Sequence, residues 1–223
     1  MPQKVGVILS GCGVLDGAEI HESVLTLLAL DRSGAEAVCM SPNKDQRDVV
    51  NHLTNQPMRG EKRNVLIEAA RIARGKIRDI KEIHAKDIDA VILPGGYGAA
   101  KNLSDYAVKG ADCEVDPEVS RLLREMTAAK KPIGAICISP VVLAKAMQVD
   151  GAVHPTLTIG CDRGVAGDLQ KMGSSHQECP VQEFVVDKEN KIVTTPAYML
   201  GPGIKEVAQG IEKLVKAVLA LIS

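Results

Sequence analysis

The sequence has few aromatic residues and no marked excess of either charge. It contains no tryptophan, one phenylalanine and three tyrosines, so few flat side chains are available for stacking against nucleic-acid bases or sugar rings. Its 27 basic residues are balanced by 28 acidic ones, and no basic stripe indicates a nucleic-acid partner. Because its apolar runs are also too short to span a bilayer, we expect neither nucleic acid nor a membrane as a partner.

Motifs for nucleotide cofactors and metal ions are missing as well. Gly11 and Gly13 match the first two glycines of Gly-x-Gly-x-x-Gly, but Asp16 stands where the third glycine is required. The sequence has no Gly-x-x-x-x-Gly-Lys-[Ser/Thr] loop, no Cys-x-x-Cys pair and no His/Asp/Glu spacing suited to a metal. We therefore expect a protein that uses no cofactor and no metal ion.

The cysteines are spaced too irregularly to indicate a disulfide framework. Six are present, at positions 12, 39, 113, 137, 161 and 179. A chain of 223 residues can bury a full core without disulfides, and free thiols fit a reducing compartment. Residues 1–10 contain an expected strand and do not resemble a signal peptide. We expect a cytoplasmic protein, or an organellar one whose presequence is missing here.

Short apolar runs alternate with segments of helical periodicity, which is typical of a mostly parallel sheet with helices on both faces. The pattern predicts strands at residues 5–9, 37–40, 90–93, 133–136, 157–159, 183–186 and 192–194, the last two forming a hairpin. It predicts helices at residues 22–33, 63–74, 117–130, 141–147 and 204–221. No repeat or linker divides residues 1–223, so we expect a single α/β domain.

The pattern that points most clearly to chemistry lies at residues 132–140. Cys137 falls between a short buried strand and Pro140, a residue suited to the first position of a helix. Ala135 and Ser139 are small, as a tight strand-turn-helix corner requires. This is the pattern of a nucleophile elbow with cysteine in place of serine. Since the positive end of a helix dipole favours a thiolate, we predict that Cys137 is a nucleophile; the alternative is a buried structural cysteine.

Two other glycine-rich segments, residues 10–17 and 94–98, also follow predicted strands. In open α/β sheets, ligands bind beyond the carboxyl ends of the strands. We expect the N–H groups of Gly96 and Ile138 to form an oxyanion hole, although such glycines can also serve only to make tight turns. Cys12, in the first segment, is either a second thiol at the site or a small residue in a crowded turn.

Acidic residues and histidines supply candidates for proton transfer. A carboxyl group buried near a thiol would have a raised pKa, and Glu22 lies close enough to the first strand to fill this role. The alternative for Glu22, and the favoured interpretation of Glu19, is stabilisation of a helix N-terminus. Among five histidines, His154 is the best candidate for a base, and His21 is expected to point away from its neighbour Glu22. The other histidines lie in polar segments.

Several of these segments resemble one known family. Residues 135–140, Ala-Ile-Cys-Ile-Ser-Pro, resemble the Ala-Ile-Cys-x-Gly-Pro of the ThiJ/PfpI superfamily, which has a class I glutamine amidotransferase-like fold. Residues 93–103 resemble its Leu-Pro-Gly-Gly segment, and Glu22 matches its helix glutamate. Residues 6–17, 63–75 and 191–199 are similar to one subgroup, the isoprenoid biosynthesis glyoxalases. The similarity extends over nearly the whole chain.

The resemblance implies a flavodoxin-like three-layer sandwich, a homodimer and a glyoxalase that needs no cofactor. Its substrate would be a small dicarbonyl compound, glyoxal, and its product glycolate. By the same resemblance Cys137 would add to an aldehyde, Gly96 and Ile138 would bind the oxyanion, and Glu22 would move a proton between the two carbons. The subgroup name implies a loose link to isoprenoid biosynthesis. Repair of glycated amines by a deglycase is an alternative origin of the same activity.

One region departs from the family pattern. Many members place a histidine downstream of the cysteine, where residues 156–162 here read Thr-Leu-Thr-Ile-Gly-Cys-Asp. The missing histidine argues against a full Cys-His-acid triad, and so against a glutaminase subunit that feeds ammonia to a partner. It somewhat favours a rival function, a redox-sensing or regulatory protein whose Cys137 is oxidised to a sulfinic acid held by protonated Glu22.

Overall fold

Seven strands form one sheet in the order β10-β11-β7-β6-β1-β2-β5, in a computed structural model that describes residues 2–148 and 153–222. Every pair is parallel except β10 and β11, which form the predicted antiparallel hairpin. In chain order the five central strands run 2-1-3-4-5, which is the flavodoxin-like arrangement. The strands are β1 (Lys4–Ile8), β2 (Glu36–Ser41), β5 (Arg78–Asp79), β6 (Ala90–Leu93), β7 (Ile133–Ile136), β10 (Val185–Asp187) and β11 (Ile192–Thr195).

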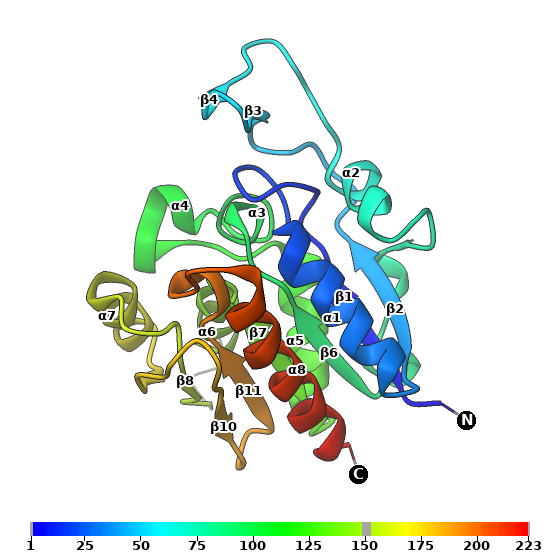
Figure 1. Cartoon of the computed structure of the whole chain (residues 1–223), viewed down its shortest axis with the longest axis vertical. Helices are drawn as coiled ribbons and strands as arrows, with labels where there is room; N and C mark the ends of the chain where they lie inside the picture. The colour runs from blue at the N-terminus through cyan, green and yellow to red at the C-terminus, as the bar shows by residue number, and fades with distance from the viewer. Residues whose placement is uncertain (1, 149–152, 223) are drawn as a thin grey trace.

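Helices cover both faces of this sheet (Figure 1). One face carries α1 (Ile20–Arg32), α2 (Val65–Ile72) and α8 (Ile204–Ala220). The other carries α5 (Pro117–Ala128) and α6 (Pro140–Gln148), with the short helices α3 (Tyr97–Lys101) and α4 (Tyr106–Lys109) and the helix α7 (Arg163–Lys171) beside them. A separate cluster of buried apolar side chains fills each interface. The predicted fold class is therefore confirmed.

The central strands and the last helix show why the apolar pattern predicted these elements. All four residues of β6 and all four of β7 are buried, as expected for parallel strands covered on both sides. On α8 the predicted inward face is buried along the helix, whereas Leu221, just beyond its end, is only half-buried. The buried residues of that face are Val207, Ile211, Leu214, Val215 and Val218.

The structure differs from the prediction in several regions, among them the short elements β3 (Val50–Asn51), β4 (Gln56–Pro57), β5, α3 and α4, which were not predicted. The strand predicted at residues 157–159 is β8 (Thr156–Leu157), which pairs with β9 (Ser175–His176) outside the main sheet. Helix α7 was not predicted, because its sequence contains two glycines and few apolar residues. Short 3₁₀ helices were also missed, since they have no periodicity of their own; they span Ile80–Glu82, Ala85–Asp87, Gly110–Asp112 and Ala197–Met199.

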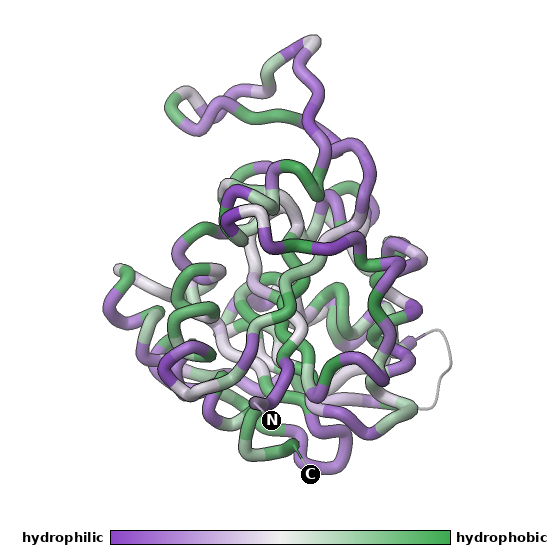
Figure 2. Tube along the Cα trace, turned by 90° about the vertical axis from the view of Figure 1, so that its right-hand side faces the viewer, coloured by the Kyte–Doolittle hydropathy of each residue, from purple (hydrophilic) through white to green (hydrophobic). Residues whose placement is uncertain are grey.

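An arm projects from the body between β2 and α2 (Figures 1 and 2). It contains the two-stranded hairpin of β3 (Val50–Asn51) and β4 (Gln56–Pro57). His52, predicted only as a surface residue, accepts a hydrogen bond at Nε2 from the Leu15 N–H group and so ties the arm to the first glycine-rich segment. Among the residues described, no helix is long and apolar enough to cross a membrane.

Candidate active site

The three predicted strand ends meet at one edge of the sheet. Strands β1, β6 and β7 are neighbours, and the chain leaves them through residues 10–17, residues 94–98 and the corner at Cys137. The two glycine-rich segments pack backbone against backbone, because the Glu19 N–H group donates to the Gly95 carbonyl at 2.9 Å and the Gly98 N–H group donates to the Gly17 carbonyl at 2.8 Å. This edge places a thiol, a carboxyl group and free backbone N–H groups together.

Gly95 is required by this close packing. A Cβ atom at this position would lie 2.5 Å from the Cys137 Cβ atom and 2.7 Å from Glu22 Oε2. Atoms of folded proteins do not approach so closely, so any side chain here would push the thiol and the carboxyl group apart. The glycine therefore allows Cys137 and Glu22 to be neighbours.

Cys137 has the strained backbone of a nucleophile elbow. Its φ angle is +61°, a conformation that non-glycine residues rarely adopt. Its N–H group donates to the Thr195 carbonyl at 3.0 Å, and the Ser139 hydroxyl donates to the Pro94 carbonyl at 2.7 Å, so two neighbouring segments hold the corner. Only 8% of Cys137 is exposed. Strain held in this way is characteristic of functional sites, and it fits the predicted strand-turn-helix geometry.

Ala197 is a second strained residue at the site, and it was not among the predicted site residues. It is buried and has a φ angle of +43°. This turn presents the N–H group of Tyr198 to Glu22 Oε1 at 3.2 Å. Tyr198 therefore belongs to the candidate site, and only three-dimensional packing could reveal it, because the residue lies far from Glu22 in sequence.

Glu22 is completely buried on α1 and faces Cys137. One carboxyl oxygen, Oε2, accepts a hydrogen bond from the Gly95 N–H group at 2.8 Å, and Tyr198 binds the other. Burial raises the pKa of Glu22 to about 7, and the nearby charge of Glu19 adds to this effect. A carboxyl group whose pKa lies near neutrality can both accept and release a proton under physiological conditions.

The Cys137 thiol is coupled to this carboxyl group. Burial, and next the charge and hydrogen bonding of Glu22, raise the pKa of Cys137 well above its usual value, while the N–H groups of Gly96 and Ile138 act in the opposite direction. The helix dipole, which favours a thiolate, is therefore outweighed here, because desolvation and the adjacent carboxylate raise the pKa of Cys137. Instead the thiol can pass its proton to Glu22 when it attacks a substrate.

Glu19 has the structural role predicted for it and also a position that was not predicted. Its Oε2 atom accepts a hydrogen bond from the Glu22 N–H group at 2.7 Å and so caps the first turn of α1. It also lines the pocket in front of Cys137, which has a volume of about 390 Å³. The other lining residues are Val14, Gly96, Tyr97, Ala100, Tyr106, Ala107, Ile138, Asp162, Val165, Tyr198 and Met199.

Two predicted neighbours of Cys137 lie elsewhere. The His154 Nδ1 atom is 2.9 Å from the Gly173 carbonyl, and His154 does not line the pocket, so it is not the base partner proposed from its position in the sequence. Cys12 is partly exposed and does not line the pocket either; burial raises its pKa, and the nearest charges that act on it are those of Glu68 and Arg71 on α2. Cys12 therefore lies outside the pocket that Cys137 lines.

His21 reaches the edge of the site in a way that the sequence did not predict. Its side chain is exposed, whereas that of Glu22 is buried, and its Nδ1 atom lies 2.7 Å from the Tyr198 hydroxyl group. Within residues 2–148 and 153–222, no group of three or more His, Cys, Asp and Glu side chains is arranged to hold a metal ion. The chemistry at this edge thus rests on the thiol, the carboxyl group and the backbone N–H groups.

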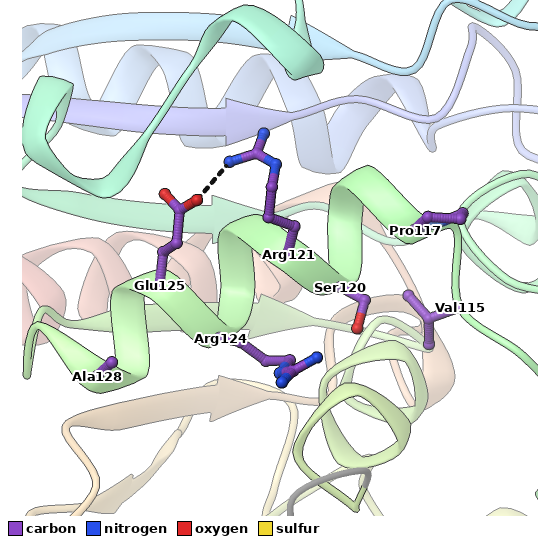
Figure 3. Close-up of a pocket in the computed structure, with 7 residues that line it drawn as sticks. All are labelled: Val115, Pro117, Ser120, Arg121, Arg124, Glu125 and Ala128. Atoms are coloured by element: carbon purple, nitrogen blue, oxygen red, sulfur yellow. Dashed lines mark hydrogen bonds and ion pairs between the residues drawn. The ribbon is translucent and has the colours of Figure 1, made fainter.

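A second hollow lies on the outer surface of α5 (Figure 3). Arg121 forms an ion pair with Glu125 on one flank of it, at 2.7 Å between Nη1 and Oε1, and also pairs with Glu118. Its lining contains neither a cysteine nor a histidine and shares no residue with the pocket at Cys137. We therefore take the pocket at Cys137 as the candidate active site.

Comparison with protein families places this geometry among known proteins. The model of the DJ-1/PfpI family matches residues 12–199, which include Cys12, Glu22, Cys137 and Tyr198. The chain is 44% identical, over 98% of its length and 83% of the relative's, to human "glutamine amidotransferase-like class 1 domain-containing protein 3, mitochondrial". It is also 44% identical to the rat "ES1 protein homolog, mitochondrial", covering 98% of this chain and 84% of that protein.

Solved structures agree with this assignment. An isoprenoid biosynthesis protein with an amidotransferase-like domain from Ehrlichia chaffeensis superposes with a TM-score of 0.92 at 39% identity, covering 99% of this chain and 100% of that one. This similarity confirms the resemblance to the isoprenoid biosynthesis subgroup. Drosophila melanogaster DJ-1beta superposes with a TM-score of 0.53 at 21% identity, over 99% of this chain and 96% of that one, and so shares the fold.

Proposed function

The chain belongs to the DJ-1/PfpI family, and from its buried Cys137–Glu22 pair we propose that it is a cofactor-independent glyoxalase converting glyoxal to glycolate. The observation that carries this proposal is the placement of a strained, pocket-lining thiol beside a buried carboxyl group whose pKa is about 7. Such a pair can add to a carbonyl carbon and then transfer a proton without an external redox agent.

The reaction begins with addition of the Cys137 sulfur to one aldehyde carbon. The thiol proton passes through Glu22 to the aldehyde oxygen, which gives a hemithioacetal and returns Glu22 to its carboxylate form. The N–H groups of Gly96 and Ile138 would stabilise the negative charge that develops on that oxygen. Both groups border the pocket and act on the Cys137 sulfur in the free protein.

Glu22 then carries a proton between the two carbons. It removes the C–H proton from the sulfur-bearing carbon, giving an enediolate, and delivers that proton to the neighbouring carbon, while the hydroxyl proton moves from the first oxygen to the second. The first carbon is thereby oxidised to a thioester and the second is reduced to an alcohol. Water hydrolyses the thioester, so glyoxal plus water becomes glycolate, and the free thiol is restored.

Several finer features of the proposal follow from resemblance. A link to isoprenoid biosynthesis is suggested by the name of the Ehrlichia chaffeensis protein, and repair of glycated amines remains an alternative source of the same products. We also retain the proposal of a homodimer. The six free cysteines favour a reducing compartment: we propose the cytoplasm, while the human and rat relatives are named mitochondrial.

Glycolate formation from glyoxal by the unchanged protein and by Cys137→Ala tests this function. We expect steady formation of glycolate, detected by proton NMR, and its loss in the variant at unchanged thermal stability. Cys39→Ala removes a different buried thiol and serves as the matched control, with turnover retained. No glycolate from the unchanged protein, or equal rates in the protein and Cys137→Ala, would contradict the proposal.

The alternative function is redox sensing, and one observation favours it. The pocket lining contains no histidine to complete a hydrolytic triad, whereas a protonated Glu22 could donate a hydrogen bond to an oxidised Cys137. Mild peroxide followed by peptide mass spectrometry separates the two functions. Selective oxidation of Cys137 to the sulfinic acid without measurable turnover of glyoxal would support the sensor.

A further inference from the structure

The charges that border the pocket all have one sign. Glu19 and Asp162 are the charged residues of its lining, and both are acidic. Asp162 accepts hydrogen bonds at Oδ1 from the Gly164 and Val165 N–H groups, at 2.9 and 3.0 Å, and so caps α7. Glu19 caps α1 in the same way through one oxygen. Each carboxylate is thus fixed beside the pocket by one oxygen, and its second oxygen has no hydrogen-bond partner among the described residues.

Two basic side chains near the pocket, Lys101 and His21, are bound by other groups. The Lys101 Nζ atom donates to the Leu15 carbonyl at 2.9 Å and pairs with Asp48 at 3.1 Å. His21 is held by the Tyr198 hydroxyl group. No lysine or arginine contributes to the lining in the part of the chain that the structure describes. The nearest of these cations, Lys101, lies behind the lining residue Tyr97, with its Nζ atom 5.7 Å from the ring centroid, so an anionic substrate would meet two carboxylates and no lysine or arginine of the lining.

The pocket is also larger and more apolar than glyoxal requires. Its volume is about 390 Å³, and a water molecule in the liquid occupies about 30 Å³, so it has room for on the order of ten water-sized groups. Val14, Ala100, Ile138, Val165 and Met199 contribute apolar surface to its wall. Glyoxal, with two carbons, would leave most of this surface uncovered.

We propose that Glu19 and Asp162 make this pocket selective for uncharged carbonyl compounds that carry an apolar group, and that they exclude carboxylates and phosphates. This inference rests on the proposed function, since it names the class of substrate for the reaction at Cys137. Glyoxal is then the smallest acceptable compound. The apolar wall supplies binding energy that glyoxal does not use, and the two carboxylates raise the energy of any anion near the thiol.

Charge selection can be measured without turnover by alkylating Cys137. Iodoacetamide is neutral, iodoacetate is anionic, and N-benzyliodoacetamide is neutral with an apolar group. Rates are measured by peptide mass spectrometry at pH 8 and divided by those of 2-mercaptoethanol, a small neutral thiol. Because each comparison is a ratio at one thiol, changes in the proton affinity of Cys137 cancel.

For each thiol we compare the rate of alkylation by iodoacetamide with the rate by iodoacetate. We expect this ratio of rates to be roughly tenfold higher at Cys137 than at 2-mercaptoethanol. Glu19→Gln and Asp162→Asn, which keep an oxygen for each helix cap, should each reduce this preference by about threefold. N-benzyliodoacetamide should react several-fold faster than iodoacetamide relative to the free thiol. Glu178→Gln removes an exposed carboxylate outside the lining and should leave every ratio unchanged.

The proposal is overturned if iodoacetate reacts as readily as at the free thiol, if both lining variants keep the full preference, or if the benzyl group slows the reaction. Failure of Cys137 to react even with iodoacetamide also overturns it, since the pocket would then admit no neutral compound. The proposed function fails separately, by absence of glycolate formation. A charge preference without turnover would therefore uphold selective binding and reject the glyoxalase.

Discussion

Two cysteines follow strands of the same sheet, and their surroundings differ in ways that distinguish a reactive corner from a structural one. At the end of β7, Cys137 itself adopts the positive φ angle, is buried and contacts a buried carboxyl group. Beyond the end of β1, the neighbours of Cys12, Gly11 and Gly13, adopt the positive φ angles, at +111° and +128°. Cys12 thus lies in a turn whose unusual backbone conformations are adopted by glycines, so the backbone of the cysteine itself is not strained.

The carboxylates near the two thiols differ as well. Glu68, whose charge acts on Cys12, forms ion pairs with Arg71 at 3.0 Å and Arg63 at 3.6 Å. Glu22 forms no ion pair with a cation of residues 2–148 or 153–222 and is bound by two N–H groups. Burial raises the pKa of Glu22 to about 7, so this carboxyl group can exchange a proton near neutral pH. The comparison indicates that the reactive cysteine is distinguished by its own strained backbone and by a buried acid without a paired cation. Proximity to glycines does not distinguish it.

The largest effect on turnover is expected from removing the acid beside Cys137, and a much smaller one from removing the acid whose charge acts on Cys12. Glu22→Gln should lower the turnover of glyoxal by roughly 10²- to 10⁴-fold, because an amide cannot carry the proton between the carbons. The matched variant Glu68→Gln should retain turnover within about threefold, since this acid stabilises α2 and the arginines around it. Steady-state glycolate formation measures both, and similar losses in the two variants would remove the distinction.

The pH dependence of stability should also single out Glu22. Because burial raises its pKa from 4.5 to about 7, the folded state binds this proton more tightly than the unfolded state does. Its contribution is fully present below pH 4.5 and is lost as the pH rises through about 7, by roughly 3 kcal/mol in total. Urea unfolding should show the stability difference between wild type and Glu22→Gln falling across this range. A difference that stays constant with pH would contradict the assigned burial.

Crowding at the reactive corner can be tested with a pair of glycine variants. Gly95→Ala introduces a methyl group that must displace Cys137 or Glu22, and we expect a destabilisation of about 1–3 kcal/mol together with loss of most turnover. Gly167→Ala, in α7, meets no atom within 4 Å and should stabilise the protein by about 0.5–1 kcal/mol with turnover retained. Wild-type turnover in Gly95→Ala would show that this contact does not position the pair.

The smallest effect is expected at the other cysteine. Cys12→Ser should change glyoxal turnover by less than about twofold, because this thiol is outside the pocket and serine is a close match in size. Kinetics at saturating and limiting glyoxal would detect a change in either step. A loss as large as that of Cys137→Ala would restore Cys12 to the site.

The sequence pointed to Cys137 and Glu22, and to Gly96 and Ile138 beside them, but not to the rest of the pocket wall. Cys137 was recognisable because Pro140 and its small neighbours encode a local corner, and the apolar runs of β6 and β7 matched the observed strands. Tyr198 and Asp162 reach the pocket through loops whose paths depend on tertiary packing. His154 was wrongly favoured because distance along the chain does not report distance in space.

The influence of the surroundings on the Cys137 thiol could not be predicted, for a related physical reason. A helix dipole is a local property that can be inferred from Pro140, whereas the desolvation of Cys137 and the approach of Glu22 depend on how α1 packs against the sheet. Glu19 illustrates both cases. Its cap on α1 involves residues close in sequence and was predicted. Its position in the pocket wall depends on tertiary packing and was not predicted.

The central claim is that Cys137, and not Cys12, adds to the carbonyl carbon. Both thiols can be labelled with iodoacetamide in one sample, with and without glyoxal, and followed separately by peptide mass spectrometry over a short incubation. We predict that glyoxal slows the labelling of Cys137 and leaves the rate at Cys12 unchanged. Equal slowing of both cysteines, or no slowing of Cys137, would contradict the account.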